Sequence, residues 1–225
     1  MSNFEPLKSP YKNVNEAFED ASKNYPDNVA IAFYYQDKET IYTYKDLSDI
    51  VLKFANGLKS LGFNKGDHIG IVLANVPEFV ISFYSIMKIG AVGCSIIKIL
   101  KPNEIADISK NAELKGLIIN SDKKRVVKKC LNVTPSLKHV ITVGDKEMEL
   151  EGVETHKFWE AVEELGSLTP INVDVELDDW ATINFTSGTT EKPKGTIYTN
   201  RNYVYAALAQ KLSTKLTPEE VIVLV

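Results

Sequence analysis

The sequence is poor in the residues that build metal centres and disulfide frameworks. Among 225 residues there are only two cysteines and three histidines. Cys94 and Cys130 lie far apart and lack metal-ligand spacing, so we interpret them as buried thiols of a protein in a reducing compartment. His68, His139 and His156 are scattered along the chain. No metal site made from protein side chains is therefore expected.

Two further features are missing, an excess of basic charge and a long apolar segment. The formal net charge is −4, which argues against a nucleic-acid binder, because such proteins carry a basic stripe. The N-terminus lacks the basic and apolar regions of a signal peptide. The longest apolar stretch, residues 79–100, is interrupted by lysine and glycine, so no transmembrane segment is expected. These absences predict a cytoplasmic protein.

The chain does contain an alternation of strand and helix patterns. Apolar runs typical of strands buried on both faces alternate with amphipathic segments of helical period, which predicts an α/β fold with mainly parallel sheets flanked by helices. The predicted strands cover residues 29–35, 40–44, 68–74, 91–97, 117–120, 139–143, 180–185, 195–199 and 221–225. The predicted helices begin after the caps Asn13, Thr43 and Asn200 and also cover residues 77–90, 103–111, 122–131 and 156–165.

The same pattern divides the chain into three parts. Residues 1–143 form a first α/β block with an N-terminal hairpin. Residues 144–178 form an acidic, irregular connection that holds one helix. Residues 179–225 start a second α/β block, and its last helix is expected to have an inner face made of Val204, Ala207, Leu208 and Leu212. Because residues 221–225 have the pattern of a buried strand that stops early, we expect the sequence to continue beyond them.

The most specific feature is the segment 186–195, which reads Thr-Ser-Gly-Thr-Thr-Glu-Lys-Pro-Lys-Gly. Its hydroxyl groups can donate to phosphate oxygens, and successive amides around a glycine can form an anion-binding nest. A predicted strand on either side places the segment at a sheet edge, where α/β proteins bind ligands. The residues expected to contact phosphate are Thr186, Ser187, Gly188, Thr189, Thr190 and Lys194. The alternative is a solvated hairpin turn rich in serine and threonine.

The segment differs from a Walker A loop, because six residues separate Gly188 from Gly195 and no lysine precedes a serine or threonine there. It resembles the phosphate-binding signature of the adenylate-forming superfamily, Thr-Ser-Gly-Thr-Thr-Gly-x-Pro-Lys-Gly. That superfamily includes acyl-CoA synthetases, firefly luciferase and the adenylation domains of peptide synthetases. The resemblance covers nearly the whole chain and is strongest to medium- and long-chain fatty acid–CoA ligases. Its other matching segments are residues 43–47, 65–69, 75–79 and 88–91.

The resemblance implies a carboxylate-activating enzyme that forms an acyl-adenylate and pyrophosphate from ATP, then transfers the acyl group to CoA. It also implies that the adenine and ribose contacts, a Mg²⁺-linked glutamate and the catalytic lysine all follow residue 225. The chain would then be the N-terminal portion, truncated before the C-terminal domain and inactive when isolated. ATP, Mg²⁺ and CoA are expected for the complete enzyme. A homodimer is also expected, because an incomplete sheet exposes apolar surface.

Glu191 departs from the family signature, which has glycine or serine at this position. A carboxylate 4 Å from a phosphate charge is repelled by about 1 kcal/mol in water and by about 4 kcal/mol near a protein surface. Glu191 therefore either faces solvent or weakens ATP binding. This residue supports an alternative function, a truncated relative that serves as a non-catalytic binding or partner protein. A further alternative is a different ATP-using α/β enzyme with a convergent loop.

Three other clusters are interpreted as structural. Aromatic residues between 33 and 44 are expected to pack the hairpin on the sheet, with a ligand platform as the alternative. The basic run 123–129 is expected to be a solvated helix face, although it could meet an acidic lipid or a CoA phosphate. Asp178 and Asp179 are expected to form a turn and not a metal-binding pair.

Overall fold

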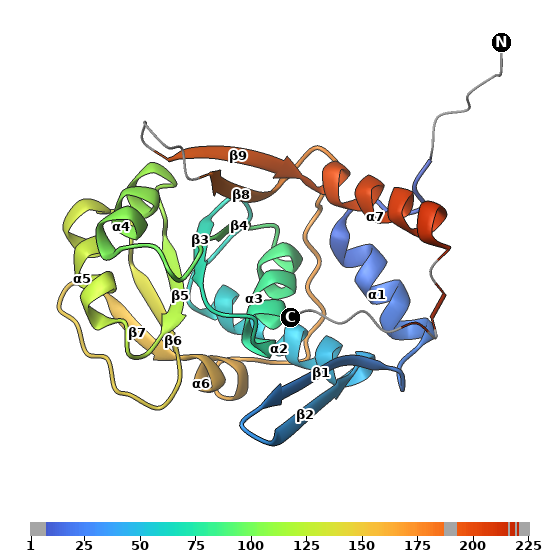
Figure 1. Cartoon of the computed structure of the whole chain (residues 1–225), viewed down its shortest axis with the longest axis horizontal. Helices are drawn as coiled ribbons and strands as arrows, with labels where there is room; N and C mark the ends of the chain where they lie inside the picture. Colours follow the sequence, from blue (N-terminus) through green and yellow to red (C-terminus); the bar gives the residue numbers. More distant parts are fainter. Residues whose placement is uncertain (1–7, 187–192, 216, 219, 221–225) are drawn as a thin grey trace, which may run out of the picture.

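A computed structural model describes residues 8–186, 193–215, 217–218 and 220 of the chain. Its main feature is a seven-stranded sheet in the order β7-β6-β5-β3-β4-β8-β9 (Figure 1). All neighbouring strands in it are parallel except β8 and β9. This arrangement confirms the predicted α/β class with a mainly parallel sheet. The strands are β3 (His68–Val72), β4 (Val92–Ser95), β5 (Gly116–Asn120), β6 (His139–Val143), β7 (Glu154–Lys157), β8 (Trp180–Thr186) and β9 (Lys194–Thr199).

Helices cover both faces of this sheet. On one face α2, α3 and α6 pack in a core with Ile118 of β5, and on the other face α4 and α5 pack with Leu117 and Ile119 of the same strand. Successive residues of β5 thus point into opposite cores, which explains why the strand is continuously apolar. The helices are α1 (Val14–Asn24), α2 (Tyr44–Ser60), α3 (Pro77–Lys88), α4 (Pro102–Asn111), α5 (Lys124–Val133), α6 (Phe158–Glu163) and α7 (Asn200–Thr214).

A separate two-stranded sheet forms the N-terminal hairpin, β1 (Val29–Tyr35) with β2 (Lys38–Thr43). The hairpin was predicted with a four-residue connection, but the turn contains only Gln36 and Asp37, both with positive φ. Two such residues give a turn whose twist matches that of the strands, which lets β2 begin at Lys38.

The local signals at helix ends are confirmed at α2. The Thr43 hydroxyl accepts a hydrogen bond from the Asp46 amide, and the Asp46 carboxylate accepts one from the Thr43 amide. Gly62 follows the helix with φ +84°, as expected for a left-handed C′ residue. At α1 the Asn13 side chain caps the Glu16 amide, while Glu16 accepts from Lys12 and not from Asn13.

Strand β7 was not predicted and is the largest correction to the sequence analysis. It lies within residues 144–178, which were expected to hold only one helix, and it pairs in parallel with β6. The seven-stranded sheet therefore crosses both predicted block boundaries, since β7, β8 and β9 all belong to it. The division of the chain into three blocks stays a prediction.

Helix α7 differs from the prediction in two respects. Thr199 is its cap, and the Thr199 amide and hydroxyl both donate to Asn202 Oδ1. The expected cap Asn200 is already helical. Of the predicted inner face, Val204 is buried, whereas Leu212 is 58% exposed. The predicted strand at residues 221–225 lies outside the described part of the chain.

The two cysteines are buried as expected. Burial raises the pKa of Cys94 to about 12 and that of Cys130 to about 11, so both thiols stay protonated at neutral pH. On α5 the basic side chains of Lys124, Arg125 and Lys128 are exposed, which confirms the predicted solvated face. No helix in the described part of the chain combines the length and apolar character needed to cross a bilayer.

Candidate functional site

The predicted phosphate-binding segment joins the two strands of the β8–β9 hairpin at the edge of the sheet. The backbone of Thr186 pairs with Lys194, and these residues end β8 and begin β9. Four predicted site residues, Ser187, Gly188, Thr189 and Thr190, lie outside the described residues, as does Glu191. The structure therefore defines where the segment leaves and re-enters the sheet.

The hairpin has a polar face that leads toward this segment. Residues directly opposite each other in an antiparallel pair lie on the same face, and so does every second residue along each strand. Thr182 lies opposite Tyr198, and Asn184 lies opposite Thr196. Lys194, which is exposed, follows Thr196 on this face at the mouth of the segment. Thr182 is buried and its hydroxyl is hydrogen-bonded to Tyr203 at 2.8 Å, so it is not a phosphate ligand. The Asn184 amide, the Thr196 hydroxyl and the Lys194 ammonium are the groups of this face with the chemistry to donate to phosphate oxygens.

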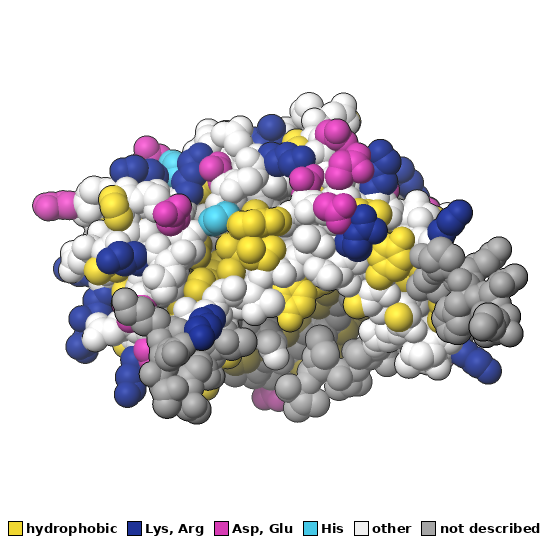
Figure 2. All heavy atoms as spheres, turned by 90° about the horizontal axis from the view of Figure 1, so that it is seen from above, with side chains coloured by type: hydrophobic (Ala, Val, Ile, Leu, Met, Phe, Trp, Pro, Cys, Tyr) yellow, Lys and Arg dark blue, Asp and Glu magenta, His cyan; other side chains and the backbone are white. Residues whose placement is uncertain are grey.

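The opposite face of the hairpin is apolar. Phe185 lies across Gly195, where an added Cβ would come within 2.8 Å of Ile183 and 3.1 Å of the Phe185 ring. Together with Trp180, Ile197 and the His68 ring, these residues line a shallow hollow of about 300 Å³. Figure 2 looks onto this side of the molecule and shows apolar side chains gathered beside a histidine. On this face Ile183 is buried, whereas Trp180 and Ile197 are 46% and 41% exposed, and the absence of a side chain at Gly195 allows the close approach of Phe185.

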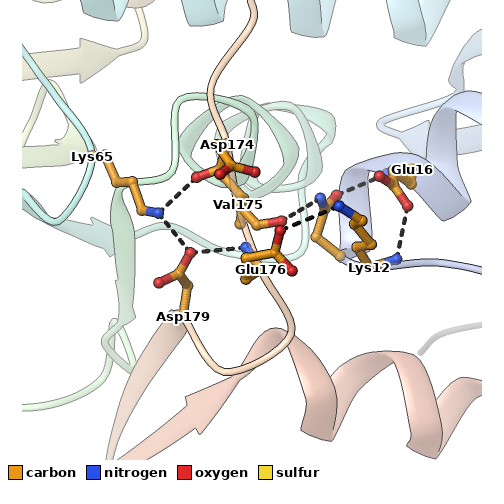
Figure 3. A network of polar contacts seen from close by, with 8 residues as sticks. Lys12, Glu16, Lys65, Asp174, Val175, Glu176 and Asp179 are labelled. Atoms are coloured by element: carbon orange, nitrogen blue, oxygen red, sulfur yellow. Dashed lines mark hydrogen bonds and ion pairs between the residues drawn. The ribbon is translucent and has the colours of Figure 1, made fainter.

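Residues 174–179 hold the start of β8 against the loop before β3 (Figure 3). Lys65 Nζ donates to the Asp174 carbonyl at 2.6 Å and pairs with an Asp179 carboxylate oxygen at 2.7 Å. The same oxygen of Asp179 accepts the Glu176 amide at 2.8 Å. The hydrogen bond from Lys65, followed by the one from the Glu176 amide, lowers the pKa of Asp179 below its usual range. The predicted turn at Asp178 and Asp179 is thus confirmed, with Asp179 as its anchor.

Two asparagines tie the same segment to helices α1 and α7. Asn13 Nδ2 donates to the Val175 carbonyl at 2.9 Å. Asn200 is only 2% exposed, its Nδ2 donates to the Asp179 carbonyl at 3.3 Å, and its Oδ1 accepts the Val14 amide at 3.2 Å. Sequence reasoning missed both bridging roles, because each partner lies far away along the chain.

An exposed ion pair, Arg201 with Asp178, lies beside the start of β8. The Arg201 guanidinium donates to both carboxylate oxygens of Asp178, at 2.8 and 3.0 Å. The pair joins the start of α7 to the segment before β8, so both ends of the hairpin are held at the same place.

Comparison with known proteins supports the superfamily resemblance. The family described as "AMP-binding enzyme" matches residues 18–225. The chain is similar to the crotonobetaine/carnitine–CoA ligase of Salmonella typhimurium strain LT2, with 30% identity over 217 residues that cover 93% of this chain and 41% of that protein. The chain thus spans less than half the length of this curated relative.

Solved structures give the same result. The chain is similar to a long-chain fatty acid–CoA ligase from Archaeoglobus fulgidus, with a TM-score of 0.81, 25% identity, and coverage of 95% of this chain and 42% of that one. It is also similar to an anthranilate–CoA ligase solved in complex with anthranoyl-AMP, with a TM-score of 0.77, 25% identity, and coverage of 90% and 37%.

The Asp179 anchor leads to a prediction about stability. We expect Asp179→Asn to lower the free energy of unfolding at about pH 7 by roughly 1–2 kcal/mol, because charged hydrogen bonds are lost from a partly exposed site. The folded-state pKa of Asp179 is lowered, so its contribution is present above the unfolded-state pKa and disappears as the pH falls through the folded-state value. Urea unfolding at about pH 7 and about pH 3 measures both effects.

The matched control is Asp145→Asn, which makes the same change at an exposed carboxylate in the loop after β6. We expect it to change stability much less than Asp179→Asn. Equal effects of the two substitutions, or an Asp179→Asn deficit that persists undiminished at acid pH, would contradict the anchoring role.

Proposed function

Because the chain belongs to the family of AMP-binding enzymes, we propose that it forms the N-terminal part of an ATP-dependent acyl-CoA ligase. The observation that carries this proposal is the polar face of the β8–β9 hairpin, which leads into the Thr-Ser-Gly-Thr-Thr segment. The donors on this face have the chemistry that phosphate oxygens require. The segment follows the carboxyl end of β8, and α/β proteins bind ligands outside the carboxyl ends of their parallel strands.

In this proposal the segment 186–195 holds the β- and γ-phosphates of ATP. Backbone amides around Gly188 and the hydroxyls of its neighbours donate to phosphate oxygens, and Lys194 supplies a positive point charge. Donors fixed in place before the reaction stabilise the charge that develops on the departing pyrophosphate. Thr186 and Lys194 lie at the two ends of this segment, which supports their roles.

The complete enzyme would join a carboxylic acid to the AMP part of ATP, release pyrophosphate, and then transfer the acyl group to CoA. The resemblance favours medium- or long-chain fatty acids as the acid. Mg²⁺ would accompany the nucleotide, and the residues that bind adenine and perform catalysis would lie beyond the matched part. A cytoplasmic location and a homodimer belong to the same proposal and stay predictions.

Glu191 favours one alternative, a non-catalytic binding or partner protein of the same family. A carboxylate in a phosphate-binding segment opposes the anion that the segment would bind. Reading the genomic sequence past residue 225 distinguishes the two functions. In-frame Tyr-Gly-x-Thr-Glu and Thr-Gly-Asp motifs would support the ligase, and a genuine stop codon would support the alternative.

The proposal predicts that the isolated 225-residue chain has no carboxylate-dependent ATP–pyrophosphate exchange. The physical reason is that phosphate contacts alone do not bring adenine, acid and catalytic lysine together. The assay is run with a complete acyl-CoA ligase as a positive control and a panel of short, medium and long acids. Exchange above the no-acid background by the pure chain would contradict the assignment of catalysis to later residues.

A second prediction concerns Glu191. We expect Glu191→Gly to tighten pyrophosphate binding about fivefold or more, since removing a repulsion of about 1 kcal/mol or more lowers Kd by that factor. Titration calorimetry of pyrophosphate into the chain measures the change.

The matched control is Glu149→Gly, in the loop between β6 and β7 at the other end of the sheet. It makes the same change in net charge and backbone freedom. Identical affinities for both variants and the parent chain would show that Glu191 does not face the phosphates.

A further inference from the structure

Strands β6 and β7 bring together two histidines that are well separated in the sequence. His139 pairs with Glu154, and Ile141 pairs with His156, in the parallel register of these strands. Glu154 and His156 are two residues apart on one strand, so their side chains lie on the same face as that of His139. The histidines are scattered along the sequence, but β7, which the sequence did not predict, brings His139 and His156 together.

The three side chains converge on one point. Nδ1 of His139 lies 3.4 Å from Oε2 of Glu154, and Nε2 of His156 lies 3.7 Å from the same oxygen. One ligand atom from each residue lies within 4.8 Å of the other two. In a tetrahedral zinc centre with bonds near 2 Å, ligand atoms lie about 3.3 Å apart. The spacing is thus close to that of a metal site and long for direct hydrogen bonds.

One ring nitrogen of each histidine is buried and makes no hydrogen bond in the described part of the chain. His139 Nδ1 and His156 Nε2 are buried without a hydrogen-bond partner among the residues that the structure describes. The whole His139 residue is only 9% exposed, so solvent has little access to its ring. A buried nitrogen without a partner costs free energy, and metal coordination removes that cost.

Aromatic and charged side chains lie around the His139 ring. Phe63 covers the ring at 5.1 Å, and the nearby Lys115 ammonium is bound to Asp67 at 2.7 Å. An imidazole binds a metal through the lone pair of a ring nitrogen, and His139 and His156 each place one ring nitrogen in the cluster.

We propose that His139, Glu154 and His156 bind one divalent transition-metal ion, of which Zn²⁺ is the best fit. Two imidazoles and one carboxylate suit zinc and its neighbours, whereas Mg²⁺ and Ca²⁺ prefer sites made of oxygen atoms. Three protein ligands leave a fourth position to water. This centre is distinct from any Mg²⁺ that accompanies a nucleotide.

The position of the centre indicates a structural role. His139 and Glu154 are the first residues of β6 and β7, whereas Thr186 is the last residue of β8. In a parallel sheet the first and last residues of the strands lie at opposite ends of the strands. The metal is therefore remote from the phosphate-binding segment. The ion would link β7, a four-residue edge strand, to β6 and stabilise the end of the sheet.

The test is titration of ZnCl₂ into the metal-stripped 225-residue chain, followed by calorimetry and thermal unfolding. We expect one equivalent to bind and the midpoint of unfolding to rise, because the ion binds only the folded site. Glu154→Ala and His156→Ala should each weaken binding about tenfold or more. The Glu154 side chain is 70% exposed, so its removal should leave metal-free stability unchanged.

The matched control is His68→Ala, which removes the third histidine of the chain. Its Nδ1 lies 2.6 Å from the Ala112 carbonyl oxygen and takes no part in the cluster, so zinc affinity should equal that of the parent. Co²⁺ substitution gives an independent readout, with visible bands of a tetrahedral nitrogen–oxygen site expected and no thiolate charge-transfer band. Absence of binding, equal affinity of the parent and Glu154→Ala, or a thiolate band from Cys94 or Cys130 would each overturn the proposal.

Discussion

The position of the candidate phosphate-binding segment depends on the polar contacts that hold the start of β8. In the described part of the chain, β8 joins its parallel neighbour β4 through one register pair, Gly93 with Thr182. Such short pairing fixes a strand weakly, so additional contacts have to orient it. Lys65 binds both the Asp174 carbonyl and the Asp179 carboxylate. Asn13, Asn200 and Arg201 add further hydrogen bonds to the same segment. These contacts connect the hairpin to the loop before β3 and to α1.

The pairing of β8 with β9 extends from these contacts to the two ends of the segment 186–195. Antiparallel pairing runs from Trp180 opposite Thr199 to Thr186 opposite Lys194, so the two ends of the segment are fixed beside each other. The close approach of Phe185 over Gly195 fixes the apolar face and leaves the other face for polar groups. A phosphate site gains affinity when its donors are held before binding, since less ordering then has to occur on binding. Among the described residues, the fold fixes the two ends of the segment beside each other.

Much of this architecture was predictable because its signals are local. The capping pair Thr43 and Asp46, and the apolar runs of the inner strands, follow from short-range rules. Strand β7 was not predictable in the same way, because its sequence Glu-Thr-His-Lys is polar and it lies at an edge. Its existence depends on pairing with β6. The bridging role of Asn200 and the histidine cluster were missed for the same reason, since their partners are distant in sequence. The phosphate-binding role of residues 186–195 stays a prediction from composition and resemblance.

The central claim is that residues 186–195 form the anion-binding site of this chain. Amide NMR spectra of the ¹⁵N-labelled chain, recorded while pyrophosphate is added, test it most directly. If residues 186–195 bind the anion, the largest shift changes fall on their amides, with smaller changes along β8 and β9. The basic helix α5 carries the other concentration of positive charge. Shift changes centred on α5, with the amides of residues 186–195 unaffected, would contradict the account.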